Sequence, residues 1–470
     1  MTKTIEVNNL SFKYNDKKVL SNVSFSINEG EIVLLTGSSG EGKSTLIYLL
    51  SGIIPNLVYG EVDGEILING ETILNKKVSE ICKEVGIVLQ NAENQITHKH
   101  VDDELAFGAE NLGIEPQIIK QKIDLISKIM ALNPNDTCKR LSGGQKQKLI
   151  TGSTLLMGQK IVILDEPLAN LDKEAAHELM RTLIRLSKNK FTVLIVEHRI
   201  DLLLNYVNRV LKIESQKVIE IQKDELIKER INSIIKVDIA KKPCKNPLFF
   251  LNNVSFKANN KLILKDLTFK INKGERVLLL GDNGVGKTTL LRIIGKLIKF
   301  KKGEYISYLK DGSKCLNKPN KKWFKKVGII YQNPNYQLFM KTVKEEIYFN
   351  AFSSDYANYI ITLFGIENLL NCHPQSLSEG QKRKVSIASI LAMKPEVLLL
   401  DEPTVGQDYE SLEKLILILN KIHIETGNTM ISITHDKRCA EALTDRAFLL
   451  KKNNLLIEGD ATLVRDYFKY

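Results

Sequence analysis

The sequence repeats itself, and this internal duplication constrains the fold more than any other feature. Residues 9–13 (NLSFK) return as residues 253–257 (NVSFK), and residues 23–31 (VSFSINEGE) return as residues 267–275 (LTFKINKGE). Further segments match in the same order along both halves, which indicates two copies of one domain. A stretch with prolines and lysines but no apolar period separates the copies, as is typical of a linker. We therefore predict a first domain at 1–235, a linker at 236–247 and a second domain at 248–470.

The composition is that of a folded protein without a membrane span. Hydrophobic residues make up 43% of the chain and charged residues 26%, which excludes intrinsic disorder. The longest charge-free stretch, residues 45–60, is too short for a transmembrane helix and contains Gly52 and Pro55. The N-terminal residues show no secretory signal, and the six cysteines form no C-x-x-C pair. We expect a cytoplasmic protein with reduced thiols.

The charge balance bears on the class of partner. The chain carries 67 basic and 55 acidic residues, a formal net charge of +12. Because the lysines are scattered singly and in pairs, an anionic membrane surface or a simply lysine-rich composition is favoured over nucleic acid. We expect no nucleic-acid partner.

Each half contains continuous apolar runs that predict buried parallel strands. They are residues 31–36, 161–164 and 193–196 in the first half, and residues 276–280, 397–400 and 430–433 in the second. Strands buried on both faces read as unbroken apolar runs, and helical patterns lie between them. The sequence therefore predicts an α/β fold in each half, with a mainly parallel sheet covered by helices.

A glycine-rich loop follows the first of these runs in each half. Both loops fit G-x-x-x-x-G-K-[ST], between a predicted strand and a predicted helix, which is the context of a phosphate-binding loop. A glycine turn at a helix start is the structural alternative for one match, but two matches in register favour nucleotide binding. Lys43 and Lys287 are predicted to neutralise phosphate charge, and Ser44 and Thr288 to bind Mg²⁺. The predicted ATP-binding loop residues are Gly37, Ser38, Ser39, Gly40, Glu41, Gly42, Lys43, Ser44 and Thr45, and Gly281, Asp282, Asn283, Gly284, Val285, Gly286, Lys287, Thr288 and Thr289.

A pair of adjacent carboxylates closes another apolar run in each half. Asp165 and Glu166 precede Pro167, and the second pair, Asp401 and Glu402, precedes Pro403. A carboxylate at a strand end is placed to bind a metal, and its neighbour to deprotonate an attacking water. We predict Asp165 and Asp401 as Mg²⁺ ligands and Glu166 and Glu402 as catalytic bases.

A further motif gives a family resemblance. Residues 141–145 (LSGGQ), just ahead of the first Asp-Glu pair, resemble the signature of the ATP-binding cassette (ABC) ATPases. The second half has LSEGQ at 377–381, with Glu379 in place of the first glycine. The resemblance implies two tandem P-loop NTPase domains, each with an antiparallel β part and a helical subdomain. It also implies ATP and Mg²⁺ as ligands, and ATP contacts from Ser142, Gly143, Gly144, Gln145, Ser378, Gly380 and Gln381.

The same resemblance assigns roles to other polar residues. It implies that Gln90 and Gln332 are Q-loop residues that contact ATP and metal, and that His198 and His435 are switch histidines. It makes Asp172 and Asp408 the D-loop aspartates and Tyr14 the aromatic that stacks on adenine. Ala258 takes the place of Tyr14 in the second half and has no ring to stack on adenine, and Phe256 is the aromatic residue beside it in the sequence.

In this family two cassettes close head to tail, so each ATP meets the signature of the other cassette. We expect the two halves of this chain to form such a pair by themselves. Both predicted sites keep a base and a histidine, so we expect two hydrolysing sites. Their rates should differ, because Glu379 adds negative charge at the anion-binding end of a helix.

A narrower resemblance concerns the segments after the Q-loop glutamines. Residues 332–339 and 342–347, and more loosely 90–95 and 101–108, resemble the energy-coupling factor (ECF) importers of vitamins and transition-metal ions. It implies a transmembrane coupling subunit, a small substrate-binding membrane subunit and a place on the cytoplasmic face of the membrane; a fused ATPase pair is similar to the thiamine-precursor type. The acidic clusters at 102–104 and 345–346 would suit basic residues of a coupling helix, although acidic first turns of helices explain them equally.

Two other classes of protein share parts of this pattern. Ribosome-bound translation factors with tandem cassettes share the duplication and the basic charge, but usually carry a long charged arm and a signature ending in Glu. Chromosome and DNA-repair ATPases split the cassette with a long coiled coil, and the spacing of the motifs here leaves no room for one. The importer interpretation therefore leads, with the translation factor as the alternative.

Overall fold

The computed structural model describes residues 2–469, except 16, 39, 90–91, 169–170, 172, 199, 232–234, 236–245, 259–260, 310–318 and 452–455. It divides into two compact units, Met1–Asn232 and Ser233–Tyr470, which are described separately below. Most of the predicted linker lies outside the described residues, as do Ser39, Gln90 and Asp172. The next strand begins at Pro247, the last residue of the predicted linker, and the predicted domain bounds stay a prediction.

The first unit is built on a six-stranded sheet in the order β10-β9-β3-β8-β7-β6. Neighbouring strands pair in parallel except for β9 and β10, which pair antiparallel. Its strands are β3 (Ile32–Gly37), β6 (Val85–Val88), β7 (Ile161–Asp165), β8 (Thr192–Val196), β9 (Arg209–Glu214) and β10 (Lys217–Ile221). This confirms the predicted mainly parallel sheet.

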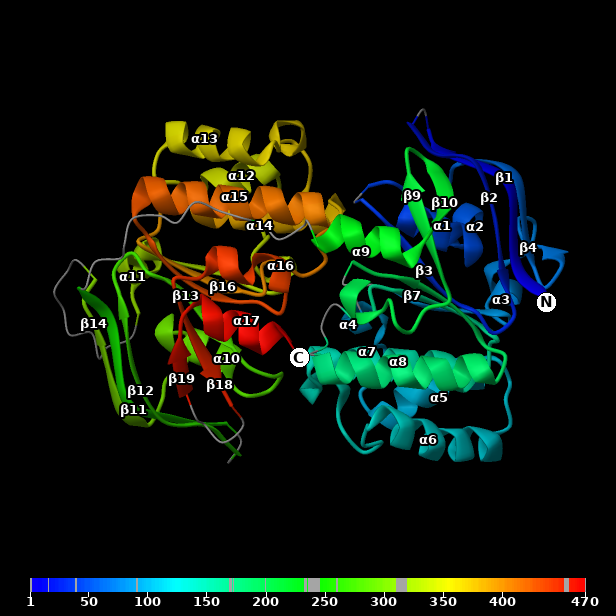
Figure 1. Cartoon of the computed structure of the whole chain (residues 1–470), viewed down its shortest axis with the longest axis horizontal. Helices are drawn as coiled ribbons and strands as arrows, with labels where there is room; N and C mark the ends of the chain where they lie inside the picture. Colours follow the sequence, from blue (N-terminus) through cyan, green and yellow to red (C-terminus); the bar gives the residue numbers. More distant parts are fainter. Residues whose placement is uncertain are drawn as a thin grey trace. The chain divides into compact units, whose positions relative to one another are not determined.

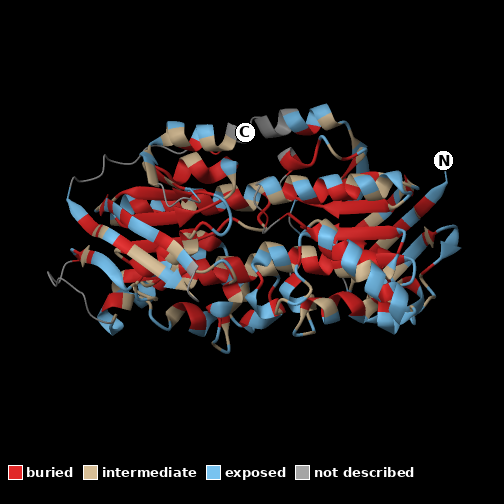
Figure 2. Cartoon of the chain, turned by 90° about the horizontal axis from the view of Figure 1, so that it is seen from below, coloured by how far each residue is buried: buried red, intermediate tan, exposed pale blue. Residues whose placement is uncertain are grey.

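Both faces of this sheet are covered, as the unbroken apolar runs predict. Along β3, Ile32 and Leu34 pack in one buried cluster, while Val33 and Leu35 pack in another on the opposite face. Successive side chains of a strand point to opposite faces, so every position of a doubly covered strand must be apolar. Figure 2 shows the central strands of each unit in the colour of buried residues.

A second, antiparallel sheet and a set of helices complete the first unit. The sheet has the order β2-β1-β4-β5, with β1 (Lys3–Tyr14), β2 (Lys17–Asn28), β4 (Glu61–Ile68) and β5 (Glu71–Thr72). Figure 1 shows α5, α6, α7 and α8 on the side of the parallel sheet opposite to α1 and α2. The helices are α1 (Lys43–Leu50), α2 (Ile53–Asn56), α3 (Val78–Ile81), α4 (Ala92–Gln95), α5 (Val101–Asn111), α6 (Pro116–Met130), α7 (Gly143–Met157), α8 (Lys173–Lys188) and α9 (Lys223–Ile231).

The second unit repeats this plan. Its six-stranded sheet has the order β15-β16-β17-β13-β18-β19, parallel except for β18 and β19, and a three-stranded antiparallel sheet has the order β12-β11-β14. The strands are β11 (Pro247–Ala258), β12 (Lys261–Asn272), β13 (Arg276–Leu280), β14 (Lys302–Ser307), β15 (Val327–Ile330), β16 (Val397–Asp401), β17 (Thr429–Ile433), β18 (Arg446–Leu450) and β19 (Leu456–Gly459). The helices are α10 (Lys287–Ile294), α11 (Lys321–Lys326), α12 (Val343–Tyr348), α13 (Ser354–Phe364), α14 (Glu379–Leu391), α15 (Tyr409–Thr426), α16 (Lys437–Ala440) and α17 (Ala461–Lys469). The predicted antiparallel β part and helical subdomain are thus present in both units.

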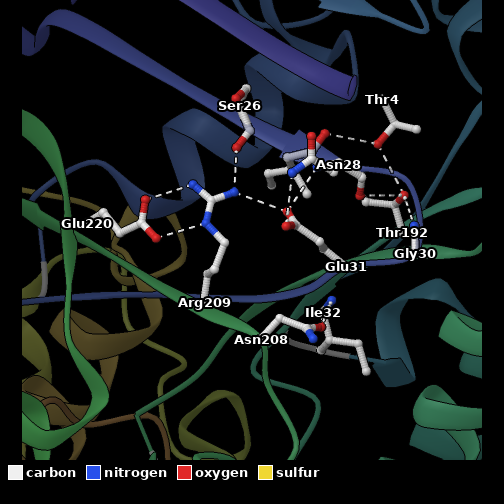
Figure 3. A network of polar contacts seen from close by, with 11 residues as sticks. Thr4, Ser26, Asn28, Gly30, Glu31, Ile32, Thr192, Asn208, Arg209 and Glu220 are labelled. Atoms are coloured by element: carbon white, nitrogen blue, oxygen red, sulfur yellow. Dashed lines mark hydrogen bonds and ion pairs between the residues drawn. The ribbon is translucent and has the colours of Figure 1, made fainter. Parts of the chain in front are cut away.

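An ion network ties the two sheets of the first unit together (Figure 3). The Arg209 guanidinium on β9 donates to both carboxylate oxygens of Glu220, at 2.8 and 2.7 Å. It also donates to Oε2 of Glu31 at 3.0 Å and to the carbonyl oxygen of Ser26 on β2 at 2.9 Å. Glu31 in turn accepts hydrogen bonds from the backbone and side-chain amides of Asn28. One arginine therefore joins the antiparallel strand β2 to β9 and to the edge strand β10 of the six-stranded sheet.

These contacts favour the charged form of both carboxylates. Burial raises the pKa of Glu31, but the hydrogen bonds from Asn28 and Arg209 outweigh burial and leave it lower than usual. The hydrogen bonds from Arg209 lower the pKa of Glu220 despite its partial burial. A carboxylate with a lowered folded-state pKa stabilises the fold above its unfolded pKa, and this contribution is lost as the pH falls through the folded value.

We expect Arg209→Met to lower the free energy of unfolding by about 2 kcal/mol at pH 7, since it leaves Glu31 partly buried without its cation. At acidic pH the carboxylates of the parent become protonated, so the gap between variant and parent should shrink below about pH 4. Urea unfolding at several pH values measures this. A gap that does not shrink at any acidic pH at which the protein is still folded would contradict the assignment.

Candidate active site

The predicted site residues of each unit meet at one edge of its parallel sheet. In the first unit the glycine loop follows β3, the Asp-Glu pair ends β7 and His198 follows β8, and these three strands are neighbours. The second unit repeats this with β13, β16 and β17. Carboxyl ends of parallel strands lie at the same edge, which is where ligands bind in open α/β sheets.

The glycines of the two loops hold backbone conformations that other residues rarely adopt. Gly37, Gly40 and Gly42 have φ of +147°, +84° and +100°, and the second loop repeats these values within about ten degrees at its matching glycines. A Cβ on Gly37 would lie 2.6 Å from the carbonyl oxygen of Ile213, whereas nothing lies within 4 Å of one on Gly40. The first glycine is therefore required by both φ and space, and the middle one by φ alone.

Each loop is closed over its own lysine. Lys43 Nζ donates to the carbonyl oxygens of Gly37 and Ser38 at 2.9 and 2.8 Å. Lys287 Nζ donates to the carbonyl oxygens of Gly281 and Asp282 at 2.6 and 2.9 Å, and lies 3.2 Å from Nε2 of His435. Both lysines are buried, so each loop holds a cation at the sheet edge where phosphate charge can be neutralised.

The oxygen donors beside each lysine suit Mg²⁺. In the second unit Thr288 Oγ1 donates to Asp401 Oδ1 at 3.1 Å, which puts a hydroxyl and a carboxylate side by side. Mg²⁺ binds few protein oxygens and takes its other ligands from phosphates and water. The described residues contain no group of three or more acidic, histidine or cysteine side chains that could hold a metal ion by themselves. Thr288 and Asp401 thus fit Mg²⁺, and Ser44 and Asp165 occupy the matching positions.

Burial raises the pKa of both aspartates, but their surroundings differ. For Asp165, burial and then the neighbouring carboxylate of Glu166 raise the pKa to about 7, against the opposing charge of Lys43. For Asp401, burial also raises the pKa, while the Thr288 hydrogen bond, Arg292 and Lys287 oppose it. A bound divalent cation favours the charged form of either carboxylate.

The glutamate and the histidine of each unit lie close together. His198 Nε2 is 3.5 Å from Glu166 Oε1, and His435 Nε2 is likewise 3.5 Å from Glu402 Oε1. All four side chains are mostly buried. A buried carboxylate beside an imidazole is arranged to accept a proton from a water and to have its orientation fixed by the ring.

Both glutamates hold a strained backbone conformation. Glu166 and Glu402 have φ of +50° and +49°, a left-handed region that costs a residue with a Cβ about 1 kcal/mol or more. The turn is held because their amides donate to the carbonyl oxygens of Val196 and Ile433 on the next strand, at 2.8 and 3.0 Å. Strain of this kind, repeated at the same position in both units, is typical of functional residues.

The signature serines cap helices in both units. Ser142 and Ser378 are the N-cap residues of α7 and α14, and each forms a reciprocal capping box with Gln145 or Gln381. The signature serines therefore have a structural role as helix caps, and their predicted contact with ATP is an additional role that stays a prediction. Glu379 lies in the first turn of α14 and pairs with Lys382, Oε1 to Nζ 3.4 Å, so part of its charge is compensated.

The predicted adenine-stacking position differs between the two units. The Tyr14 hydroxyl lies 3.4 Å from Thr45 Oγ1 of the phosphate loop helix, and its ring packs edge-on against Phe12. Ala258 ends β11 in the second unit and offers no ring. Gln332, the predicted Q-loop residue of the second unit, is exposed and lies two residues after the end of β15.

Several residues that shape the sites were missed by sequence reasoning. Glu197 is buried and accepts hydrogen bonds from the amides of Leu168 and His198, at 3.0 and 2.9 Å, so it fixes the segments after both Glu166 and β8. Its place before the histidine is taken by Thr434 in the second unit, which hydrogen-bonds Thr404 instead. The sequence signal that could have identified Glu197 is its place between an apolar run and a histidine.

The interpretation of the acidic clusters as docking charges needs correction. Glu104 and Glu346, each expected to face basic residues of a partner, are buried. Glu104 accepts from the amides of Thr97 and His98 at 2.9 and 2.7 Å, and Glu346 repeats this with the amides of Phe339 and Met340. These two carboxylates hold the loops of their own chain, because a buried charge is stable only when hydrogen-bonded. Asp103 and Glu345 remain exposed in the acidic first turns of α5 and α12.

We expect Glu346→Gln to lower the free energy of unfolding by about 1–3 kcal/mol, because the neutral amide weakens two charge-assisted hydrogen bonds in a buried site. The neighbouring Glu345→Gln is the control and should change stability by less than about 0.5 kcal/mol, since Glu345 is exposed and the one amide hydrogen bond that its carboxylate accepts, from Lys341, is exposed to water. Urea unfolding compares the two. Equal effects would show that Glu346 does not hold the loop.

Comparison with known proteins identifies the family. The sequence profile of the ABC transporter family matches residues 20–169 and, separately, residues 264–405. The chain belongs to the ABC transporter family. It is an ATPase with two tandem ABC cassettes, and the family uses ATP with Mg²⁺, which confirms the predicted enzyme class and cofactors.

Curated relatives match the ABC protein over nearly its whole length. An ABC transporter ATP-binding protein of Sulfurisphaera tokodaii is 31% identical, covering 98% of this chain and 99% of the relative. A Bacillus subtilis protein named as an HMP/thiamine import ATP-binding protein, YkoD, is 29% identical, covering 97% of this chain and 91% of its own length. The archaeal ribosome recycling factor aABCE1, solved with the stalk protein aP1, aligns with a TM-score of 0.64 at 19% identity, covering 94% of this chain and 87% of that chain. At this identity the last comparison shows the fold alone.

Proposed function

We propose that this ABC ATPase energises an importer of the energy-coupling factor type. Its partners would be a transmembrane coupling subunit and a small substrate-binding membrane subunit, with the ATPase on the cytoplasmic face of the membrane. The proposed cargo is a vitamin, with a thiamine precursor as the first candidate, or a transition-metal ion. The name of the Bacillus subtilis relative supports the thiamine-precursor candidate. None of the helices in the described part of the chain has the length and apolarity that crossing a membrane requires.

An exposed aromatic cluster in the second unit supports a membrane partner most directly. Tyr336, Phe339 and Phe349 are 68%, 67% and 57% exposed, and the last two rings pack edge to face with centroids 5.6 Å apart. Tyr336 and Phe339 follow β15 within a segment that resembles ECF ATPases, and Phe349 directly follows α12, two residues after the second such segment. Large aromatic side chains grouped on a surface mark contact sites, and they fit an apolar helix face.

The first unit presents a smaller version of this cluster. Phe107 is 41% exposed, and its ring lies 4.6 Å from that of His98. The two units therefore offer surfaces of different chemistry, one aromatic and one with a histidine. This difference supports docking to a partner whose two contact segments are not identical.

For the reaction we propose the same roles in both units. Lys43 and Lys287 neutralise phosphate charge, and Asp165 and Asp401, with Ser44 and Thr288, hold Mg²⁺, whose charge stabilises the transferred phosphoryl group. Glu166 and Glu402 accept the proton of the attacking water, and His198 and His435 orient them, as the 3.5 Å contacts support. ATP contacts from the other predicted loop, Q-loop and signature residues belong to this proposal.

That the two cassettes of one chain close on each other stays a prediction. Light scattering of the full-length chain with ATP, in a hydrolysis-deficient variant, tests it. We expect the mass of a single chain. A nucleotide-dependent doubling of the mass would instead show that closure requires two copies.

The proposed function is tested by purifying the tagged chain from detergent-solubilised native membranes and identifying its partners by mass spectrometry. We expect a multi-spanning subunit together with a small membrane protein. The double variant Phe339→Asp/Phe349→Asp should lose both partners while it keeps binding ATP. Phe352→Asp is the matched control, because Phe352 is 65% exposed but packs on Tyr356, outside the cluster.

Recovery of ribosomal proteins and RNA without membrane proteins would overturn the importer proposal in favour of a tandem-cassette translation factor. The similarity to aABCE1 concerns the fold only, and both signatures of this chain end in glutamine, at Gln145 and Gln381. No observation on this chain favours that alternative over the importer.

A further inference from the structure

The helical subdomain of the second unit contains a pocket with a volume of about 230 Å³. It lies between α13, α14 and α15, away from the loops that bind phosphate. Its lining is mostly apolar, with side chains from all three helices: Leu363, Phe364, Ile387, Leu415, Leu417 and Ile418. Leu417 is 49% exposed at its edge, so the pocket is open to ligands from solution.

Three cations line the same pocket. Arg383 and Lys384 come from α14, and Lys414 comes from α15. Lys414 also pairs with Glu410 at 2.7 Å, one turn earlier on its own helix. Lys384 forms no ion pair with any side chain in the described ranges. Lys384 therefore adds a positive charge beside the apolar wall.

The matching positions of the first unit carry a different set of side chains. Lys148, like Lys384, lies six residues after the signature serine, and Glu178, like Lys414, lies six residues after the D-loop aspartate. Lys148 Nζ and Glu178 Oε2 form an ion pair at 2.7 Å. In the second unit a lysine replaces this glutamate, so the ion pair becomes two cations.

The pocket lining of the second unit is also more apolar than the matching positions of the first unit. Thr151 and Arg181 of the first unit hold the positions of Ile387 and Leu417. The second unit thus has both a more apolar wall and a more positive rim than its own duplicate. These differences give the second unit a pocket lining that combines apolar side chains with cations, which suits a ligand that is both apolar and anionic.

We propose that this pocket binds a medium-chain fatty acid, with the carboxylate at Lys384 and Lys414 and the alkyl chain on the apolar wall. The charge selects an anion, and the lining selects a hydrocarbon chain. An apolar cavity of about 150 Å³ holds one benzene ring, so a pocket of 230 Å³ has room for a chain of about eight carbons.

The position of the pocket connects it to ATP hydrolysis. Arg383, which lines the pocket, donates from Nη1 to the carbonyl oxygen of Glu402 at 3.3 Å. Gln407 also lines it, next to Asp408 at the start of α15. If the ligand binds one conformation of these segments more tightly, it changes the affinity for ATP, and ATP changes the affinity for the ligand by the same factor.

Isothermal titration of the full-length chain with octanoate tests the proposal, with octan-1-ol and octylamine as ligands that keep the chain but lose or reverse the charge. We expect octanoate to bind with a Kd of about 0.1–1 mM, the range for a good ligand of this size, and both comparison ligands to bind at least about ten times more weakly. Equal binding of octan-1-ol or octylamine, or no octanoate binding up to about 10 mM, would overturn the proposal.

Variants that copy residues of the first unit make the test specific. Lys414→Glu restores the ion pair of the duplicate, and we expect it to weaken octanoate binding at least about tenfold. Lys421→Glu makes the same charge change on α15 outside the pocket lining and should alter Kd by less than about twofold. Leu417→Arg, which places the first unit's residue at the pocket edge, should also weaken binding. Thermal unfolding of each variant reports folding, and unchanged octanoate affinity in both folded pocket variants would refute the site.

Discussion

Replacing both Glu166 and Glu402 by glutamine is expected to reduce ATP hydrolysis by about 10²–10⁴-fold, the usual contribution of a general base. Glutamine keeps the size of the side chain and an oxygen that can still accept the His435 amide hydrogen bond at Glu402. It removes the group that accepts the proton of the attacking water. ATP binding should survive, because the phosphate loops and their lysines are unchanged. Phosphate release and nucleotide-binding assays on the same preparation measure both properties.

The exposed Glu345→Gln variant is the control, and it should hydrolyse ATP at the parental rate. Retained hydrolysis in the double variant would remove Glu166 and Glu402 from the role of base. The single variants test the predicted inequality of the two sites. If Glu379 slows the site to which its signature contributes, Glu402→Gln should lower the total rate more than Glu166→Gln does. The partial compensation of Glu379 by Lys382 makes us expect a modest difference.

Replacing Gly37 and Gly281 together by alanine is expected to abolish measurable ATP binding, with a loss of affinity of at least about 100-fold. At Gly37 the new methyl group would lie 2.6 Å from a backbone carbonyl oxygen of β9, and at Gly281 it would clash with the carbonyl oxygen of Leu450. Backbone atoms of a sheet cannot move aside easily, so the loop must move instead. Displaced amides then no longer converge on the phosphates. Fluorescent-nucleotide titration measures the loss.

The double variant Gly40→Ala/Gly284→Ala is the matched control within the same loops. Both glycines have positive φ, but nothing lies within 4 Å of the added methyl groups. We expect only backbone strain of about 1 kcal/mol per site and ATP binding within about tenfold of the parent. If both double variants lost binding equally, φ rather than the close approach would be the decisive constraint.

The fold and the grouping of the candidate site residues were predictable because each depends on local patterns that occur twice. Apolar runs such as residues 161–164 predict doubly covered strands, and the glycine loop and Asp-Glu pair directly follow such runs. Parallel strand ends meet at one edge, so Lys43, Asp165 and His198 could be grouped without knowledge of the tertiary structure.

Features that depend on burial of a single charged side chain were not predictable. Glu104 and Asp103 are acidic neighbours in one helical turn, yet one is buried on two amides and the other is exposed. Only the path of the preceding loop decides which carboxylate turns inward. The left-handed backbone at Glu166 and the hydrogen bonds of Glu197 were not predictable either. Both depend on contacts between segments that are far apart in the sequence.

The buried carboxylate of Glu346 has a consequence for how fast a partner can assemble. It holds the amides of Phe339 and Met340, so the segment that carries the aromatic cluster is ordered by its own chain. A segment that is already ordered loses little conformational entropy when a partner arrives, and association needs no slow folding step. These two amides should exchange slowly with deuterated solvent in the isolated protein. Association with the proposed membrane partner would then be limited by diffusion rather than by reshaping of the ATPase.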